Sequence, residues 1–563
     1  MITSEIRVID GNPTLFINGE QVLENAYITY FIKKARYGDF AEAGYKLYSV
    51  PLYFATRGIQ EINEIPPFDD GVFENKDAPD FSIVDRAVNQ ILEACPDAYI
   101  FPRVNMSLPL WWERENPDEL CDYGNISMDK RRPCYSSDKW LAETKRELKL
   151  FIEHIENSPY RDHICAYQLA GGNAEEWFGL DQKGSIGKRS REKFEQYKIE
   201  RGIEGTEAEY YYFLSEICAD RIIELCEYAK ELTGHRLVMG SFYGYIYDRQ
   251  DRESDHHALG KVLKSPSVDF LCSPVSYMDE RALGRDLPCM MPLESLKKHG
   301  KLYFVENDVR THLSGPLFDI PHFHNVHYRP RERWYSVEAM KMCYSKSLIK
   351  SHPFWWFDMG GGWHNYPLYM EMDKDFIEIT RSAHEKDRSG VSEVAVLVDE
   401  RVFSRFDREG RLEKVTPITY HFRNKLGVMG APYDTYIAED FDLIKDSYKA
   451  FILIEPEESE LSLKIKKEAK NCLLITPDKK DITAEELRRF LKEKGVHLYS
   501  ESDLVVYVNK SYLFFHTTDN GKVNINLPDG KKLRQIYGDK VDLDKHILPA
   551  KTGYLFEIVD AER

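Results

Sequence analysis

The sequence predicts an α/β protein made of a (β/α)8 barrel followed by two smaller domains. Three observations support this fold class. Short apolar segments alternate with amphipathic ones over the first two thirds of the chain, which is typical of parallel β/α units. The alternation then repeats on a smaller scale, and the last stretch changes to short strands separated by Asn-Gly and Asp-Gly turns. The 563 residues are enough for about three domains.

Eight strands of the barrel are expected between Asn25 and Trp363. They are Ala26–Tyr30, Leu47–Phe54, Ala98–Asn105, Ile164–Ala170, Leu237–Phe242, Val268–Val275, Leu302–Asn307 and Phe354–Met359. The segments between them include Tyr210–Thr233, where apolar residues recur at three- and four-residue steps, as on one face of a helix. An open doubly wound sheet is the alternative, but a glycine-rich phosphate turn normally follows its first strand, and the sequence has none there.

We place the barrel at residues 1–388, an α/β domain at 389–503 and a C-terminal antiparallel β domain, as a small sandwich or sheet, at 504–563. The middle domain has apolar strands at Val394–Val398, Tyr448–Ile454 and Cys472–Ile475. This flavodoxin-like pattern resembles the class I glutamine amidotransferase fold. Because Cys472 lacks the flanking glycines of a nucleophile elbow, we predict that the domain is structural.

The amino-acid composition argues against two classes of binding partner, nucleic acids and membranes. Lys and Arg number 76 against 94 Asp and Glu, which gives a net charge of −18, so a phosphate backbone would be repelled and nucleic acid is not expected as a partner. No apolar stretch approaches the length of a membrane span, and no signal-like start is present, so we expect a cytoplasmic protein without a membrane partner. The ten cysteines include no Cys-x-x-Cys pair, so most are expected to be buried free thiols.

The tryptophans point to a carbohydrate cleft. All eight precede residue 391, and several follow the ends of predicted strands, where a barrel assembles its active site. Sugar rings have apolar C–H faces that stack on aromatic rings. Packing in the core is the alternative explanation for any single tryptophan, because large aromatic side chains supply much core burial.

Two carboxylate sites stand at predicted strand ends. Glu175 and Glu176 follow the fourth strand in Gly171–Gly179, and Glu306 ends the seventh. Cleavage of a glycosidic bond needs two carboxyl groups, one protonated and one ionised, and these two strands face each other across a barrel mouth. Alternatively, Glu306 forms a structural ion pair with Arg310 or a neighbouring arginine.

Beyond these features, the chain resembles clan A glycoside hydrolases, and its layout is most similar to that of family 42 β-galactosidases, with related layouts in family 164 β-mannosidases. Three short segments are similar to sequence motifs of family 42: Pro109–Trp112, Asn116–Asp118 and Arg131–Ser136. The resemblance implies that Glu306 is the nucleophile and Glu176 the acid/base. Glu175 then stands where the family has an asparagine that binds the sugar 2-hydroxyl, a role that Asn173 fills if the loop bulges.

The resemblance implies a retaining exo-β-glycosidase that acts without a cofactor, β-galactosidase-like in substrate, with an oligosaccharide or glycoside as its partner. A β-mannosidase or another clan A exo-glycosidase is the alternative, and a non-catalytic carbohydrate-binding scaffold is the alternative of another class. Whether Glu175 or Glu176 is the acid/base stays open. Ring-binding residues are expected among a set taken from strand ends and family echoes: Arg131, Arg132, Asn173, Trp177, Tyr277, Trp356 and Trp363.

The resemblance also bears on metal and assembly. Some family members hold a structural zinc in a barrel loop, but here only Cys134 stands near that position, and a tetrahedral site needs more ligands. His256 and His257 lack other ligand types at a useful spacing. We therefore predict no metal. By the same resemblance the expected assembly is a homotrimer in which the middle domain serves association.

Overall fold

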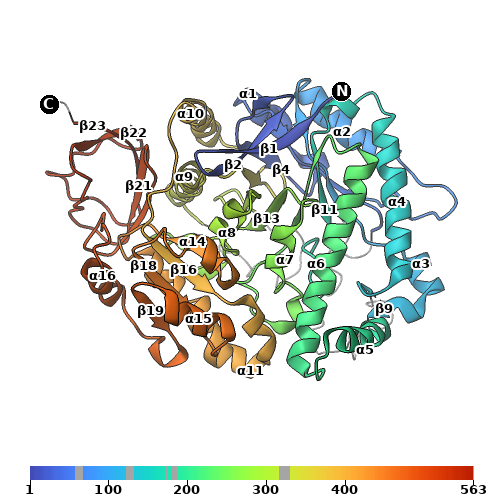
Figure 1. Ribbon diagram of the computed structural model, residues 1–563. Helices are drawn as coiled ribbons and strands as arrows, with labels where there is room; N and C mark the ends of the chain where they lie inside the picture. The colour runs from blue at the N-terminus through green and yellow to red at the C-terminus, as the bar shows by residue number, and fades with distance from the viewer. Residues whose placement is uncertain (57–67, 122–131, 173, 180–186, 316–329, 562–563) are drawn as a thin grey trace.

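The computed structural model describes residues 1–56, 68–121, 132–172, 174–179, 187–315 and 330–561. Figure 1 shows the barrel on the right, the middle domain in orange beside it, and the C-terminal sheet at the left edge. The three parts follow one another along the chain in the predicted order. No helix among the described residues is both long and apolar enough to cross a membrane.

The barrel forms as predicted and is closed. Its parallel strands, in order around the barrel, are β4 (Asn25–Ile28), β5 (Leu47–Tyr48) with β6 (Pro51–Tyr53), β7 (Tyr99–Ile100) with β8 (Arg103–Asn105), β11 (Ala166–Ala170), β12 (Val238–Phe242), β13 (Phe270–Pro274), β14 (Leu302–Asn307) and β15 (Phe354–Phe357). The second and third strands are each broken once. β4 pairs with β5 and with β15, while β6 pairs with β8 and β8 with β11, so the ring is complete.

Helices cover the outside of the barrel. They include α2 (Ser82–Ala94), α4 (Asp138–Glu156), α6 (Glu207–Leu232), α9 (Arg333–Lys350) and α10 (Pro367–Ala383). Helix α6 begins with a capping box: the Thr206 hydroxyl accepts the backbone N–H of Glu209, and the Glu209 carboxylate accepts the N–H of Thr206. This local signal starts the helix at Glu207, three residues before Tyr210, where the apolar periodicity predicted its start.

An N-terminal sheet, which was not predicted, packs against the amino end of the barrel. Strands β1 (Ser4–Ile9), β2 (Asn12–Ile17) and β3 (Glu20–Gln21) pair in antiparallel fashion. The Ser4 hydroxyl donates to the carbonyl of Cys165 and accepts the N–H of Val238, at the starts of β11 and β12. Because these are the amino ends of the strands, the opposite end stays available for a site.

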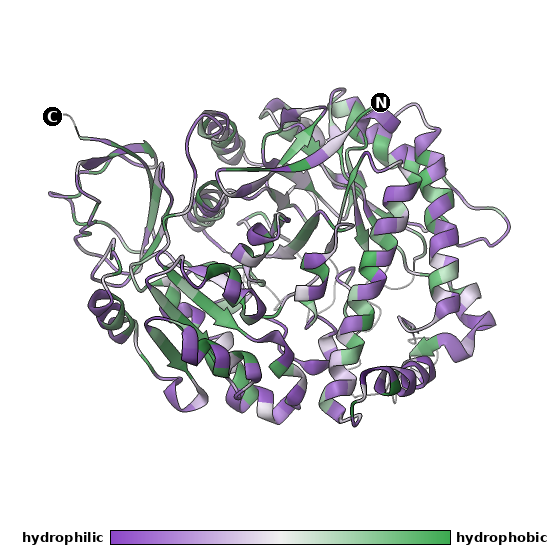
Figure 2. Ribbon diagram, viewed as in Figure 1, coloured by the Kyte–Doolittle hydropathy of each residue, from purple (hydrophilic) through white to green (hydrophobic). Residues whose placement is uncertain are grey.

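The middle domain is a four-stranded parallel sheet. Its order is β17 (Asp434–Ile437), β16 (Val394–Val398), β18 (Ala450–Ile454) and β19 (Cys472–Ile475), with helices such as α15 (Glu460–Glu468) and α16 (Ala484–Glu493) outside. Figure 2 shows hydrophobic strands and amphipathic helices here. Strand β17 was not predicted, because its first two residues are polar and half-buried. It packs on α8 (Leu293–Lys298) of the barrel, where Glu294 accepts the N–H of Thr435.

The C-terminal domain is one antiparallel sheet, ordered β20 (Leu504–Val508), β21 (Tyr512–Thr517), β23 (Gly553–Asp560) and β22 (Lys531–Tyr537). Its side chains divide by strand alternation. Tyr507 and Phe514 join the main core against α9, while Val506 and Phe515 belong to a separate cluster on the other face. The described residues therefore form one sheet, with a barrel helix as the neighbouring layer instead of a second sheet.

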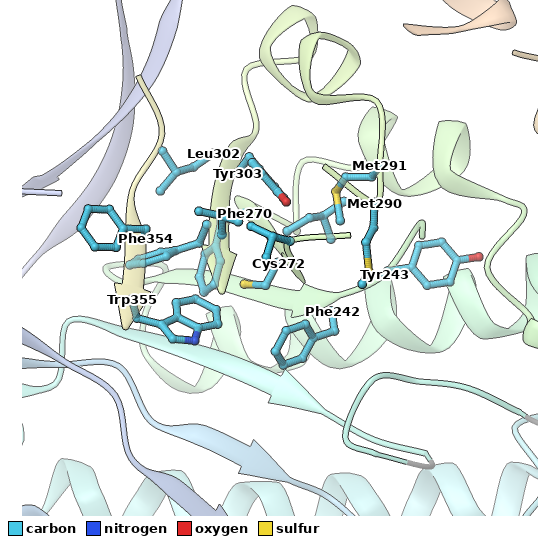
Figure 3. Close-up of a cluster of buried hydrophobic side chains, with 14 of the residues drawn as sticks. Phe242, Tyr243, Phe270, Cys272, Met290, Met291, Leu302, Tyr303, Phe354 and Trp355 are labelled. Carbon is cyan, nitrogen blue, oxygen red and sulfur yellow. The ribbon is translucent and has the colours of Figure 1, made fainter. Parts of the chain in front are cut away.

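Side chains from all the strands fill the barrel. Figure 3 shows Phe242, Phe270, Cys272 and Trp355 among the buried side chains there. Gly240 on β12 leaves the space that the Phe270 ring occupies, since a Cβ at this glycine would stand 2.3 Å from that ring. The interior is therefore a packed core below the mouth.

A buried ion pair joins the start of the barrel to the segment that leaves it. Arg388, which follows α10, donates to both carboxylate oxygens of Glu24 at 3.0 and 2.7 Å, and both side chains are about nine-tenths buried. We expect Arg388→Met to lower the free energy of unfolding by about 3–5 kcal/mol, because it leaves a buried carboxylate without its cation. Urea denaturation measures this. The double variant Glu24→Gln with Arg388→Met should recover much of the loss, and a single variant as stable as wild type would contradict the prediction.

Candidate active site

The predicted carboxylates meet at the carboxyl end of the barrel. Glu306 is the penultimate residue of β14, and Glu175 and Glu176 lie in the loop that follows β11. Because the strands are parallel, their carboxyl ends share one mouth of the barrel. In strand β14 the side chains alternate, so Glu306 and Phe304 face the barrel interior, where Phe304 packs on Trp355.

An arginine on the third strand joins two of the three carboxylates. Arg103 on β8 donates through Nη2 to Glu306 Oε2 at 2.8 Å, and its Nη1 lies 3.4 Å from Glu175 Oε2. Its Nε donates to Gln168 on β11 at 3.1 Å. The Arg103 side chain is 1% exposed, so the cation is held in place by these partners. Glu306 therefore has a structural partner, as the alternative interpretation expected, but the partner is Arg103 and not Arg310.

Glu306 also accepts a hydrogen bond from Trp355, whose Nε1 lies 3.0 Å from the same oxygen, Oε2. Burial raises the pKa of the Glu306 carboxyl, and the Arg103 guanidinium and the two hydrogen bonds oppose that rise by stabilising the ionised form. Both donors bind Oε2 and so orient the carboxylate, and no described side chain donates a hydrogen bond to its other oxygen, Oε1.

Glu176 stands in a different environment. It is partly exposed, whereas Glu175 is fully buried. The Tyr245 hydroxyl donates to Glu176 Oε1 at 3.0 Å. Burial, and after it the charge of Glu306, raise the pKa of Glu176 to about 8. Glu176 therefore holds its proton at neutral pH, and the contribution of Glu306 shows that the two carboxyl groups lie within electrostatic reach of each other.

The loop that carries Glu176 has an unusual backbone. Ala174, Glu175 and Trp177 have positive φ angles of 56°, 68° and 58°, which residues with a Cβ rarely adopt. Such strain persists only where surrounding contacts hold it. One contact is His256, whose Nε2 lies 2.8 Å from the Glu176 carbonyl.

His256 links this loop to the end of β12. Its Nδ1 accepts the N–H groups of Gly244 and Tyr245 at 3.1 and 3.2 Å, so Nε2 carries the proton and donates to the Glu176 carbonyl. Phe178 stacks on its ring, with 4.5 Å between ring centres. Burial keeps the pKa of His256 well below its ordinary value, so the ring stays neutral. His256 thus positions both Tyr245 and the backbone of Glu176.

Two predicted ring-binding residues lie near the carboxylates. Tyr277, after β13, is 36% exposed, and the Arg281 guanidinium covers its ring at 4.1 Å. Trp363, after β15, is 5% exposed, and the Arg310 guanidinium lies 4.5 Å from its ring centre. Tyr277 presents the more accessible aromatic surface of the two.

The structure does not bring Trp356 or Trp177 to the carboxylates. On β15 the inward side chain is Trp355, and Trp356 faces α10, where its Nε1 donates to Asp373 at 2.7 Å. Trp177 is fully buried, packs on Tyr135 and donates to a backbone carbonyl of β11. Strand alternation explains the first difference, and the turn of the strained loop explains the second.

The remaining predicted residues lie beside the mouth or outside the described ranges. Arg132 lines a cavity together with Cys134 and Trp177, and its Nη1 lies 3.7 Å from Glu113 Oε1. Arg131 and Asn173 lie outside the described residues. Within the described ranges, no three His, Cys, Asp or Glu side chains are grouped so that they could hold a metal ion.

Several residues of this site were missed in the sequence. Arg103 has a signal, because a charged residue interrupts the apolar strand Ala98–Asn105. Trp355 is harder to identify in the sequence, because the adjacent Trp356 is the same residue type on the same strand. Only the strand register decides which of the two faces Glu306. Tyr245 and His256 have no such signal, because they reach Glu176 through a loop that folds back from β12.

The proton on Glu176 predicts how stability changes with pH. The folded protein keeps that proton up to a pH of about 8, whereas an unfolded carboxyl loses it near the ordinary value of 4.5. Between these values the folded state binds more protons, so raising the pH lowers the stability of the wild type. We expect Glu176→Gln to melt progressively higher than wild type as pH rises from about 5 to about 8. Differential scanning calorimetry measures this, and exposed Glu493→Gln should show no such trend.

Comparisons with known proteins agree on the fold. No protein-family model and no curated protein matches the chain. Among solved structures, it is similar to a β-galactosidase from Bacillus circulans sp. alkalophilus, with 11% identity, 95% of this chain and 98% of the other covered, and a TM-score of 0.62.

The chain is also similar to a β-galactosidase from Rahnella sp. R3, with 10% identity, 95% of this chain and 98% of the other covered, and a TM-score of 0.61. A family 42 exo-carrageenase from Bacteroides ovatus gives 12% identity, 99% of this chain and 86% of the other covered, and a TM-score of 0.57. The chain therefore has, over nearly its whole length, the fold found in family 42 β-galactosidases.

Proposed function

We propose that this protein is a retaining exo-β-glycosidase with a β-galactosidase-like substrate. One observation carries the proposal: at the barrel mouth, a carboxyl group that holds its proton at neutral pH, Glu176, lies within electrostatic reach of a carboxylate oriented by two donors, Glu306. Glycoside hydrolysis needs such a pair, in which one group is an acid and the other is ionised. The fold shared with β-galactosidases supports the same class.

The proposed mechanism is a double displacement. Glu306 attacks the anomeric carbon through Oε1 while Glu176 gives its proton to the leaving oxygen. When the aglycone has left, Glu176 is ionised and takes a proton from water, whose oxygen attacks the anomeric carbon; the bond to Glu306 breaks, Glu306 leaves as its carboxylate, and the sugar is released. The Tyr245 hydroxyl, which donates to Glu176 at 3.0 Å, stabilises the ionised form that this second step requires.

In this proposal Glu176, not Glu175, is the acid/base. Glu175 has no exposed surface and pairs with Arg103, whereas Glu176 is partly exposed and has no such ion pair among the described residues, which favours Glu176 as the proton donor. Its position allows a different contribution, because it helps Gln168 and Glu306 to hold the Arg103 guanidinium. Glu175 is then a positioning residue for the nucleophile.

Kinetics of three variants test the roles on a panel of nitrophenyl β-glycosides. Glu306→Gln should abolish turnover. Glu176→Ala should lower kcat/KM by about 10²–10⁴-fold for poor leaving groups, spare good ones and be partly rescued by azide, because only the acid's proton is lost. Glu175→Gln keeps a side chain of similar shape next to Arg103 and should not respond to azide.

The same panel decides the substrate and the class of protein. Turnover of the galactoside with retained anomeric configuration, followed by NMR, is the expected result. Preferential turnover of the mannoside would move the protein to the mannosidase alternative. Azide rescue of Glu175→Ala but not of Glu176→Ala would reverse the assignment of the acid, and absence of turnover on the whole panel would favour a binding scaffold.

We also propose that the protein assembles as a homotrimer through its middle domain. Leu443 on α14 (Phe441–Ile444) and Leu463 on α15 are about half exposed, and Lys464 and Asp442 form an ion pair that holds these two helices side by side. Light scattering should give a mass of about 197 kDa, three times the 65.8 kDa of the chain. A monomer mass at micromolar concentration would contradict the proposal, and Leu463→Glu should weaken the assembly if this surface is used.

A further inference from the structure

Two arginines at the barrel mouth share one carboxylate. Asp308 follows β14 directly, and its Oδ2 lies 3.0 Å from Arg281 Nη1 while its Oδ1 lies 3.5 Å from Arg310 Nη1. The three side chains are each at least nine-tenths buried. A buried guanidinium is costly unless acceptors satisfy its donors, so the group has one more positive charge than its carboxylate neutralises.

The acceptors are divided unequally between the two arginines. Arg281 donates to the Asp308 carboxylate and backbone carbonyl, and also to the carbonyls of Val275 at 2.8 Å and Ser276 at 3.3 Å. In the part of the chain that the structure describes, Arg310 has the 3.5 Å contact with Asp308 and two contacts of 3.8 Å with the sulfur of Met359. A thioether is a weak acceptor for a guanidinium that carries five N–H donors.

Arg310 is held within electrostatic reach of the proposed nucleophile. Its guanidinium lies 4.5 Å from the ring centre of Trp363, which limits its movement. It interacts electrostatically with both Glu306 and Tyr277. A sugar whose anomeric carbon is presented to Glu306 would therefore have this cation close to its ring substituents.

We propose that the site is selective for a sugar that carries an anionic substituent, a carboxylate or a sulfate, and that Arg310 binds it. This inference rests on the proposed function for the position of the sugar. A guanidinium binds two oxygens of either group in a planar, charge-assisted arrangement, which would give Arg310 stronger acceptors than it has among the described residues. The whole chain carries a net charge of −18, which would repel a polyanionic polysaccharide. We therefore expect the ligand to carry its anionic group on the one sugar unit that Arg310 contacts.

The test measures binding, so it does not depend on turnover. Calorimetric titration of the full-length protein compares galactose, galacturonic acid and galactose 6-sulfate, together with the gluco and manno counterparts of each. We expect at least one anionic sugar to bind roughly tenfold or more tightly than its neutral parent. Preference for the acid or for the sulfate then identifies the source of the charge. Equal affinities for neutral and anionic sugars, or no binding by any of them, would overturn the inference.

Matched variants assign the preference to Arg310. Arg310→Gln should remove most of the anionic preference and leave the affinity for the neutral sugar within about twofold of the wild-type value. Arg310→Lys keeps the charge without the fork and should retain part of the preference. The control is Arg381→Gln on α10, an exposed arginine paired with Glu378, which should change nothing.

Two other results separate the explanations. If Arg310→Gln weakens neutral and anionic sugars equally, Arg310 only balances the charge of Glu306, and the inference fails. If an anionic sugar binds through Arg310 but no glycoside of any kind is hydrolysed, the inference stands and the proposed hydrolase function fails.

Discussion

The buried guanidinium of Arg103 is the interaction on which the site depends. It comes from the third strand, and its partners come from the fourth strand, the loop after it and the seventh strand. A buried cation needs partners on several sides, and removing any one of them would leave charge uncompensated. The need to pair the Arg103 guanidinium constrains how these strands align at the mouth. It places Glu175 next to Nη1 and Glu306 next to Nη2 of the same cation.

The same charge separates the chemistry of the carboxyl groups. Glu306 is bound by Arg103 and Trp355, which favour the ionised form, while Glu176 lies outside the reach of Arg103's hydrogen bonds and has its pKa raised to about 8. Two glutamates at one barrel mouth therefore have different hydrogen-bond and charge environments, which is the basis of the different roles that we propose for them. Holding Glu176 in place requires a strained loop, and the neutral ring of His256 holds that loop from the neighbouring strand.

The other parts of the chain support the barrel scaffold. The N-terminal sheet seals the amino end of the barrel, and the middle domain packs on α8 through β17. The C-terminal sheet packs on α9, the helix that follows the loop bearing Asp308 and Arg310. The middle and C-terminal domains thus each pack on a barrel helix, while the N-terminal sheet contacts the amino ends of the strands.

Much of the architecture was determined by the sequence itself. The eight barrel strands, the parallel middle sheet and the antiparallel end follow from periodicity and turn residues, because these are local properties. Glu306 was recognisable because an acid at the end of an apolar strand demands a partner. The strand β17 and the N-terminal sheet escaped, since short strands with polar or half-buried residues carry little periodic signal.

Only the tertiary structure decided the details that give the site its chemistry. Trp355 and Trp356 are adjacent and identical in type, yet the pleat turns one to Glu306 and the other to Asp373. Between Glu175 and Glu176, burial against Arg103 and contact with Tyr245 made the distinction. The sharing of Asp308 by Arg281 and Arg310 depends on loops from two strands. Such choices depend on distances between segments far apart in the chain, and local sequence does not encode those distances.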